Sequence, residues 1–126
     1  MDDATRRLLG LETRRKVLGH AHVDQAAARS TELTTEFQDL LTRYSWGEIW
    51  TRPGLDERSR RILVIGTLVA LGRWDEFRVH ARAALSEGGF SAADLKEIVL
   101  QQAVYCGIPA ANTAFEALRD VIAGAR

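Results

Sequence analysis

Glycines end one helical pattern after another along this chain, and no strand pattern intervenes. Apolar residues recur at helical spacing between them, and alternating apolar and polar runs or Asn-Gly and Asp-Gly hairpin turns are absent. Glycine readily adopts the left-handed conformation that closes a helix. Helix ends are therefore expected at Gly19, Gly72, Gly88–Gly89 and Gly107. The pattern predicts an all-α domain of roughly six helices with short connections.

The expected helices follow from this punctuation. They cover residues 3–18, 31–44, 56–71, the stretch between Gly72 and Gly88, 91–106 and about 109–123. A capping-box-like start is expected at residues 91–94, and Pro109 suits a first helical turn. Residues 19–28 are expected to form a loop and 44–55 a dense irregular segment. Residues 62–70 are apolar nearly all round, which predicts a helix that is buried or shared with another subunit.

Composition limits the classes of protein. With 126 residues and 46% hydrophobic content, the chain suits one domain over 1–126. A formal net charge of zero argues against a nucleic-acid surface or a polybasic membrane contact. No apolar run suggests a signal peptide or a membrane span, so a soluble cytoplasmic protein is expected. The single Cys106 excludes an internal disulfide and a Cys-x-x-Cys site, and it suits a core position.

Glu76 and His80 are the pair with the clearest chemical potential. Four residues apart on a helix, they share a face and lie within reach of each other. A carboxylate beside an imidazole raises its proton affinity and fixes its tautomer, which makes a proton donor near neutral pH. An ordinary surface ion pair has the same spacing, so the spacing alone favours that simpler interpretation.

Two tryptophans and an arginine form a second candidate group. Trp46, Trp50 and Arg52 could wall an apolar pocket and anchor an anion. The same residue types are enriched at subunit contacts, and a pocket at an interface would satisfy both interpretations.

Weaker candidates come from clusters of charge. His20, His22 and Asp24 could suggest a metal site, but the spacing is unspecific and no second cluster adds ligands, so a pocket-lining or surface position is favoured. Of the arginines at the start of the apolar helix, one could point inward, and periodicity does not choose it.

Three stretches of the sequence carry a family resemblance. They are Val17-Leu-Gly-His-Ala-His-Val-Asp24, the block from Phe37 to Leu55 containing Trp-Gly-Glu-Ile-Trp-Thr-Arg-Pro-Gly-Leu, and the block from Gln102 to Phe115 containing Tyr-Cys-Gly-Ile-Pro-Ala-Ala. The chain resembles the carboxymuconolactone decarboxylase and AhpD-like family, and the Trp-Gly-Glu-Ile-Trp block resembles its decarboxylase branch. The match runs from about residue 17 to 122.

The resemblance implies an AhpD-like helical fold in a ring-shaped homo-oligomer, commonly a hexamer. It implies that γ-carboxymuconolactone, a small-molecule lactone, loses carbon dioxide to give β-ketoadipate enol-lactone during protocatechuate breakdown in the β-ketoadipate pathway. No metal or organic cofactor is expected.

The peroxidase-type relatives help to assign the site. They carry Cys-x-x-Cys followed after three residues by His, and the same frame here has Arg73, Glu76 and His80. Thiol–disulfide chemistry needs both sulfurs, so redox activity is not expected. The relatives' upstream glutamate aligns by eye with Arg61.

The resulting assignment gives His80 as proton donor, with Glu76 orienting it or acting as the acid itself. Arg52 is the first choice as carboxylate anchor, followed by Arg73 and Arg61, and His22, Trp46 and Trp50 are expected to line the pocket. Two alternatives stay open: the same fold acting on another lactone or β-keto acid, or a non-catalytic helical oligomeric binding module.

Overall fold

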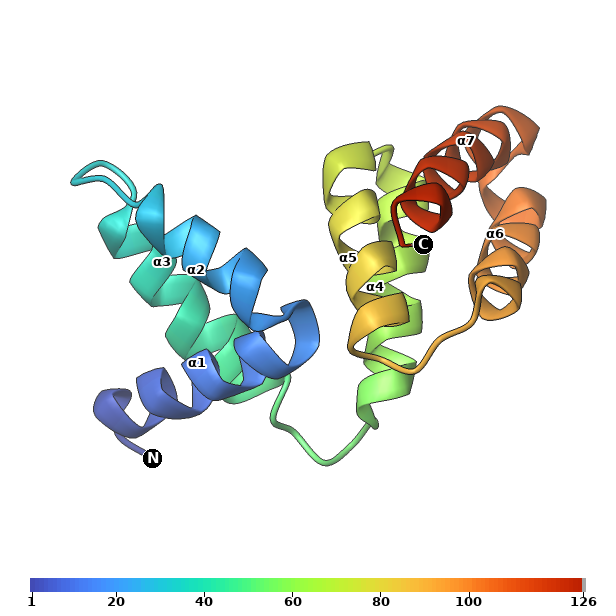
Figure 1. Cartoon of the computed structure of the whole chain (residues 1–126). Coiled ribbons are helices and arrows are strands. Elements are labelled where there is room, and N and C mark those ends of the chain that lie inside the picture. Colours follow the sequence, from blue (N-terminus) through green and yellow to red (C-terminus); the bar gives the residue numbers. More distant parts are fainter. Residues whose placement is uncertain (126) are drawn as a thin grey trace. The chain divides into compact units, whose positions relative to one another are not determined.

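The structure is a computed structural model that describes residues 1–125, all of which lie in helices or in their connections (Figure 1). The helices are α1 (Asp3–Leu18), α2 (His20–Ala28), α3 (Thr35–Leu41), the π-helix η1 (Thr42–Ile49), α4 (Glu57–Leu71), α5 (Trp74–Ser86), α6 (Ala92–Cys106) and α7 (Ile108–Gly124). No strand occurs among residues 1–125, which confirms the all-α prediction. The α-helices number seven rather than roughly six.

The chain divides into two compact units. The first unit, Met1–Glu57, holds α1, α2, α3 and η1, and the second begins at Arg58 and holds α4 to α7 apart from the first residue of α4. The assignment of residues 1–126 to one domain stays a prediction. No helix within the described residues has the length and apolar character that a membrane crossing requires.

The first unit depends on a close approach between two backbones. Gly10 of α1 and Gly47 of η1 are both buried, and the two helices pack together there. A Cβ atom added at Gly10 would lie 2.0 Å from the carbonyl oxygen of Thr42, and one added at Gly47 would lie 2.2 Å from that of Arg6. Only glycine fits at either position, so these two residues fix how α1 meets η1.

The expected loop at residues 19–28 is wrong, because the chain forms helix α2 there. Gly19, with φ of 90°, closes α1 and lets the next helix begin at once at His20. Residues 20–28 contain three consecutive alanines, the best helix formers, and no glycine or proline. Their polar residues suggested a loop. A helix can form there all the same, because Val23 is the residue of α2 that is buried and the polar side chains can face solvent.

The expected helix over residues 31–44 and the irregular segment after it are also corrected. The α-helical part is short, Thr35–Leu41, and the chain continues as the π-helix Thr42–Ile49. Its wider register appears in the bond that the Trp50 amide donates to the Ser45 carbonyl, 2.9 Å away. A π-helical turn carries no periodic signature in the sequence, and such turns are frequent at functional sites.

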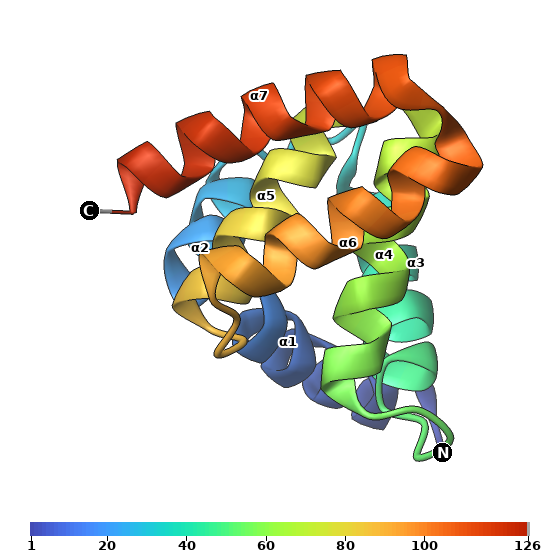
Figure 2. The same ribbon diagram turned by 90° about the vertical axis from the view of Figure 1, so that its right-hand side faces the viewer.

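The second unit holds the larger apolar core. Its fully buried members include Ile65 on α4, Phe77 on α5, Leu95 on α6 and Val121 on α7, so every helix of the unit contributes. Helix α7 packs against both α5 and α6 (Figure 2). The core of this unit is thus the scaffold that holds α5.

The local signals of the second unit are confirmed at several points. Gly72 has φ of 67° and follows the end of α4, and Gly107 has φ of 98° after α6. The capping box at Ser91 is present, since its side chain accepts from the Asp94 amide and Asp94 accepts in return from the Ser91 amide.

Helix α4 differs from expectation in its burial. The segment 62–70 suggested burial nearly all round, yet within this chain one face is buried and another is open. Ile65 and Val69 are almost fully buried, whereas Ile62 is 40% and Leu63 is 56% exposed. The alternative that this helix is shared with another subunit stays a prediction.

The glycine contact between α1 and η1 gives the first test. The Gly10→Ala variant should lower the free energy of unfolding by about 1–3 kcal/mol or more, because the new methyl meets rigid backbone rather than a flexible side chain. Denaturant unfolding followed by circular dichroism measures this. Gly54→Ala is the matched control, since its Cβ would meet nothing within 4 Å. Equal stability of the two variants would contradict the close packing.

Candidate active site

Helix α5 carries the predicted acid at the edge of the core. Phe77, Ala81 and Ala84 are fully buried and define the inner face of α5. His80 is adjacent to this face and half-buried, and its Nδ1 atom is inaccessible to solvent. The exposed part of the residue therefore lies elsewhere, so His80 is partly buried and partly accessible.

Glu76 lies one turn before His80 in the first turn of the same helix. The residue is exposed, and the described chain gives its carboxylate no hydrogen bond or ion pair. The predicted shared face is thus present without a direct bond between the two side chains. At this spacing a rotation of the Glu76 side chain can still bring its carboxylate to the imidazole.

The arginines of the second unit occupy opposite environments. Arg73 precedes α5 and is exposed, and its amide donates to the Leu68 carbonyl at 3.0 Å. Arg61, in contrast, is only 1% exposed. Of the arginines at the start of α4, Arg61 is therefore the one that points inward. Periodicity did not identify it.

The buried side chain of Arg61 rests against Gly88. A Cβ atom at Gly88 would lie 2.8 Å from Nε and 3.0 Å from Cδ of Arg61. From the sequence, Gly88 is expected only to end a helix. Its neighbour Gly89, with φ of 70°, has the conformation that a helix end favours, whereas Gly88 makes room for the guanidinium group. In the sequence, the pairing of Gly88 with Gly89 was the one feature that could have indicated this second role of Gly88.

The aromatic group of the first unit is compact. The rings of Trp46 and Trp50 stack with centroids 5.0 Å apart and an interplanar angle of 23°. Trp46 is buried and Trp50 half-buried, so one ring anchors the pair and the other reaches toward solvent. Arg52 follows two residues later, exposed, with its amide donating to the Ile49 carbonyl at 3.1 Å. The role of these residues as an apolar wall with an anion-binding arginine stays a prediction.

The histidines of α2 do not form a metal site. His20 and His22 are two residues apart on a helix, a spacing that directs side chains to different faces. His20 lies 3.2 Å from Arg15, and Asp24 pairs with the same arginine at 2.8 Å. Among residues 1–125, no three His, Cys, Asp or Glu side chains are placed to hold a metal ion. His22 is half-buried, and its pocket-lining position stays a prediction.

The predicted site residues thus fall into two groups. Arg61, Arg73, Glu76 and His80 belong to the second unit, and His22, Trp46, Trp50 and Arg52 belong to the first. The two indoles of the first unit stack on each other. In the second unit, Arg73, Glu76 and His80 follow one another along the N-cap and first two turns of α5, and their meeting in one site stays a prediction.

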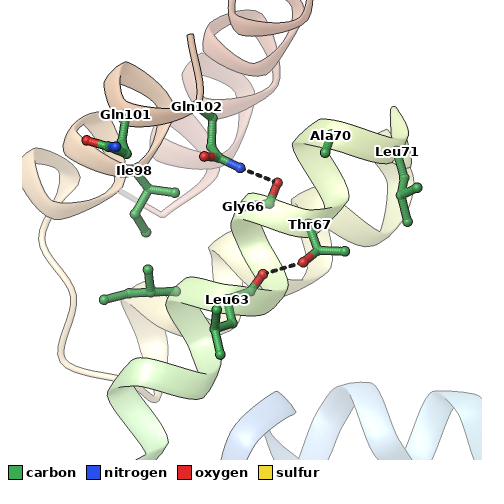
Figure 3. A pocket seen from close by; sticks show the side chains of 9 residues that line it. Leu63, Gly66, Thr67, Ala70, Leu71, Ile98, Gln101 and Gln102 are labelled. Carbon is green, nitrogen blue, oxygen red and sulfur yellow. Dashed lines mark hydrogen bonds between the residues drawn. The ribbon is translucent and has the colours of Figure 1, made fainter. Parts of the chain in front are cut away.

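A cavity of about 340 Å³ lies between α4 and α6, and it contains none of these residues. Figure 3 shows the Gln102 side chain pointing to α4, where its Nε2 donates to the Gly66 carbonyl at 2.8 Å. Thr67 likewise donates to the Leu63 carbonyl, at 2.7 Å. No charged side chain lines this cavity, so it lacks the cation and the acid that an anionic substrate would require.

Comparisons with known proteins agree on one family. The model of the carboxymuconolactone decarboxylase family matches residues 35–120, well over half of the chain. A 4-carboxymuconolactone decarboxylase from Acinetobacter baylyi is 40% identical over 121 residues, which cover 96% of this chain and 90% of the relative.

This chain belongs to the carboxymuconolactone decarboxylase family. We class it accordingly as a carboxy-lyase. A nitrosuccinic acid decarboxylase from Metarhizium robertsii is 38% identical over 110 residues, covering 86% of this chain and 76% of that protein. A 4-carboxymuconolactone decarboxylase sequence from Pseudomonas putida is 40% identical over 48 residues, its whole length and 38% of this chain.

The family match spans both groups of candidate residues. It includes Trp46, Trp50 and Arg52 in the first unit and runs through α5 with His80 in the second, whereas His22 lies before it. The parts of the chain that the family model describes are therefore those that carry seven of the eight candidates.

The contact between Arg61 and Gly88 gives the second test. Gly88→Ala should displace the Arg61 side chain or the Ala84 carbonyl, which lies 2.9 Å from the new methyl, and lower the free energy of unfolding by about 1–3 kcal/mol. Chemical denaturation of the purified protein measures the change. Gly124→Ala, in the same unit and with nothing within 4 Å of its Cβ, is the control. A Gly88→Ala protein as stable as this control would show that Arg61 is not held in place by Gly88.

Proposed function

We propose that this protein decarboxylates 4-carboxymuconolactone to β-ketoadipate enol-lactone, without a metal or organic cofactor. The observation that carries the proposal is the 40% identity to the Acinetobacter baylyi 4-carboxymuconolactone decarboxylase over nearly the whole of both chains. A soluble cytoplasmic enzyme of protocatechuate breakdown is the matching physiological assignment. The half-buried histidine on α5 supplies the chemistry that this reaction asks for.

The substrate explains why no cofactor is needed. Its leaving carboxylate sits on the quaternary ring carbon beside the ring oxygen. When the bond to that carboxylate breaks, carbon dioxide leaves, and the electron pair moves through the ring double bond into the lactone carbonyl. The resulting dienolate then takes a proton on the carbon next to the carbonyl. The substrate therefore carries its own electron sink, and the protein supplies binding, charge stabilisation and the proton.

His80 is the proposed proton donor. Its Nδ1 atom is buried while the residue as a whole is half-buried, which suits a group that is shielded in part and still accessible to substrate. Glu76 is proposed to orient and tune the imidazole once its carboxylate turns toward it. The alternative in which Glu76 itself is the acid stays open, because both side chains project from the same part of α5.

The carboxylates of the substrate need positively charged partners, and arginines can supply them. Arg52 and Arg73 are both exposed, and their planar guanidinium groups suit bidentate binding of carboxylates. Arg61 is buried, so we propose that it contributes positive charge to the site from within the second unit. Arg52 stays the first choice for binding the carboxylate that remains after decarboxylation.

The stacked indoles are proposed to form the apolar wall beside the leaving carboxylate, with His22 as a further lining residue. Trp46 is buried and holds Trp50 in place through the ring stack. An apolar surface destabilises a carboxylate relative to neutral carbon dioxide, so a wall of this kind favours the bond cleavage.

Nitrosuccinic acid is a second candidate substrate, favoured by the 38% identity to the Metarhizium robertsii decarboxylase. In both molecules one carbon bears the leaving carboxylate, a CH₂-carboxylate arm and a bond toward an electron sink. The sink is the conjugated lactone carbonyl in one and the nitro group in the other. A site that binds the CH₂-carboxylate arm serves both, and the position of the sink oxygen decides between them. Another lactone or a β-keto acid remains the wider alternative.

A homo-oligomer, commonly a ring-shaped hexamer in this family, is proposed as the working state. Four large apolar side chains in and next to α3 are between 49% and 91% exposed in the chain: Leu33 in the turn before α3, Phe37 and Leu40 on α3, and Tyr44 on η1. Exposed apolar stripes of this kind mark interaction surfaces. Multi-angle light scattering on the purified protein tests the proposal, and a monomer at micromolar concentration would contradict it. A non-catalytic oligomeric binding module would show the same assembly without turnover.

The third test removes the proposed acid. The His80→Ala variant should lose about 10²–10⁴-fold in turnover, the usual contribution of a general acid, while keeping its helical content and oligomeric state. Loss of ultraviolet absorbance of the unsaturated lactone follows the reaction. His20→Ala, which removes an exposed histidine of the other unit, should retain full turnover. Near-normal activity of His80→Ala would contradict the assignment of His80 as proton donor.

The fourth test compares substrates on the unmodified protein. Turnover of 4-carboxymuconolactone should exceed that of nitrosuccinate and should be unchanged by a metal chelator, because the electron sink lies in the substrate. Preferential consumption of nitrosuccinate would replace the first proposal by the second. Sensitivity to the chelator would refute the cofactor-free mechanism, and no consumption of either compound would favour a different substrate or the binding module.

A further inference from the structure

A second cavity, lying wholly in the first unit, has the features of a ligand site and takes no part in the proposed chemistry. It encloses about 270 Å³ among α1, α2 and α3. Leu11, Val23, Ala26 and Ala27 form its apolar side. Three arginines of α1 form a basic side, and none of the eight candidate active-site residues lines it.

Two of these arginines are already neutralised. Arg7 forms two bonds with the carboxylate of Asp39, from Nε at 2.6 Å and from Nη2 at 3.3 Å. Hydrogen bonds from Arg7 and Arg43 hold the pKa of Asp39 at about 2, so this carboxylate is ionised at neutral pH. Arg15 pairs with Asp24 at 2.8 Å.

Arg14 is the exception. Its Nη1 donates to the amide oxygen of Gln38 at 3.2 Å, a neutral partner. Within residues 1–125 its Nε is buried and has no hydrogen-bond acceptor, and no carboxylate pairs with the group. Burial lowers the pKa of Arg14, and no nearby acid offsets the effect. A half-buried cation without a counter-charge carries a desolvation cost that a bound anion would relieve.

We propose that this cavity binds a small carboxylate with an apolar body. The carboxylate would lie against the Arg14 guanidinium, and the body would lie against Leu11, Val23 and the alanines of α2. The volume falls just below the range of about 300–1,000 Å³ usual for drug-sized ligands, so only a small molecule fits. The proposal is independent of the proposed decarboxylase function, because it uses different residues.

Benzoate is a suitable probe, since it combines one carboxylate with a compact apolar ring. Isothermal titration of the full chain should show benzoate binding at least about tenfold more tightly than benzamide, which lacks the charge, or acetate, which lacks the ring. Arg14→Met should weaken benzoate binding by about tenfold or more while leaving decarboxylase turnover unchanged. Arg29→Met removes an exposed arginine at the end of α2 and should leave benzoate binding unchanged.

Methyl NMR localises the event. Benzoate should shift the methyl signals of Val23, Ala26 and Ala27 in the unmodified protein and not in Arg14→Met. Ala27→Leu narrows the cavity without a change of charge and should abolish the shifts of Val23 and Ala26, so it keeps the proposal testable if Arg14→Met fails to fold. The proposal would be overturned by equal binding of benzamide, by undiminished benzoate binding in both variants, or by shifts confined to signals of the second unit.

Discussion

The inner face of helix α5 is the constraint on which the candidate acid depends. Phe77, Ala81 and Ala84 are fully buried, and at 3.6 residues per turn they form one stripe; Ala83, farther round the helix, is buried as well. His80 falls beside that stripe, and Glu76 lies farther round toward solvent. The apolar core of the second unit therefore fixes the rotation of α5, and this rotation leaves His80 half-buried, while Glu76 is exposed in the first turn of the helix. The small alanines allow α5 to pack closely, so the helix has little freedom to turn.

The first unit reaches its geometry by a different route. It buries few large side chains, and its central contact is the glycine-to-backbone approach between α1 and η1. This approach holds the π-helix, and the π-helix holds Trp46 and Trp50 in a ring stack. The position of this aromatic surface thus depends on two glycines, which have no side chain. Substitution at either glycine would be felt at the indoles because backbone, unlike a long side chain, cannot yield locally.

Arginines in this protein are better understood by environment than by number. Arg7 and Arg15 are held by carboxylates, Arg61 is buried against Gly88, and Arg52 and Arg73 are exposed. Arg14 alone among the arginines of its cavity lacks an acid. The same side chain is therefore found in structural ion pairs, buried in the second unit, and exposed at the surface. The proposed reaction and the proposed second site both use arginine, and they draw on different members of the set.

The sequence by itself determined the all-α class, the ends of most helices, the capping box at Ser91, and the placement of Glu76 and His80 on one helix. Those features depend on local backbone preferences and on periodic burial, which a linear sequence records. Tertiary structure alone decided that residues 42–49 form a π-helix, that 20–28 is helical, and that Arg61 points inward. It also decided that Arg14 lacks a counter-charge. These outcomes depend on which groups meet across the fold, because a glycine that admits another backbone and an arginine without an acid look no different in sequence from any other glycine or arginine.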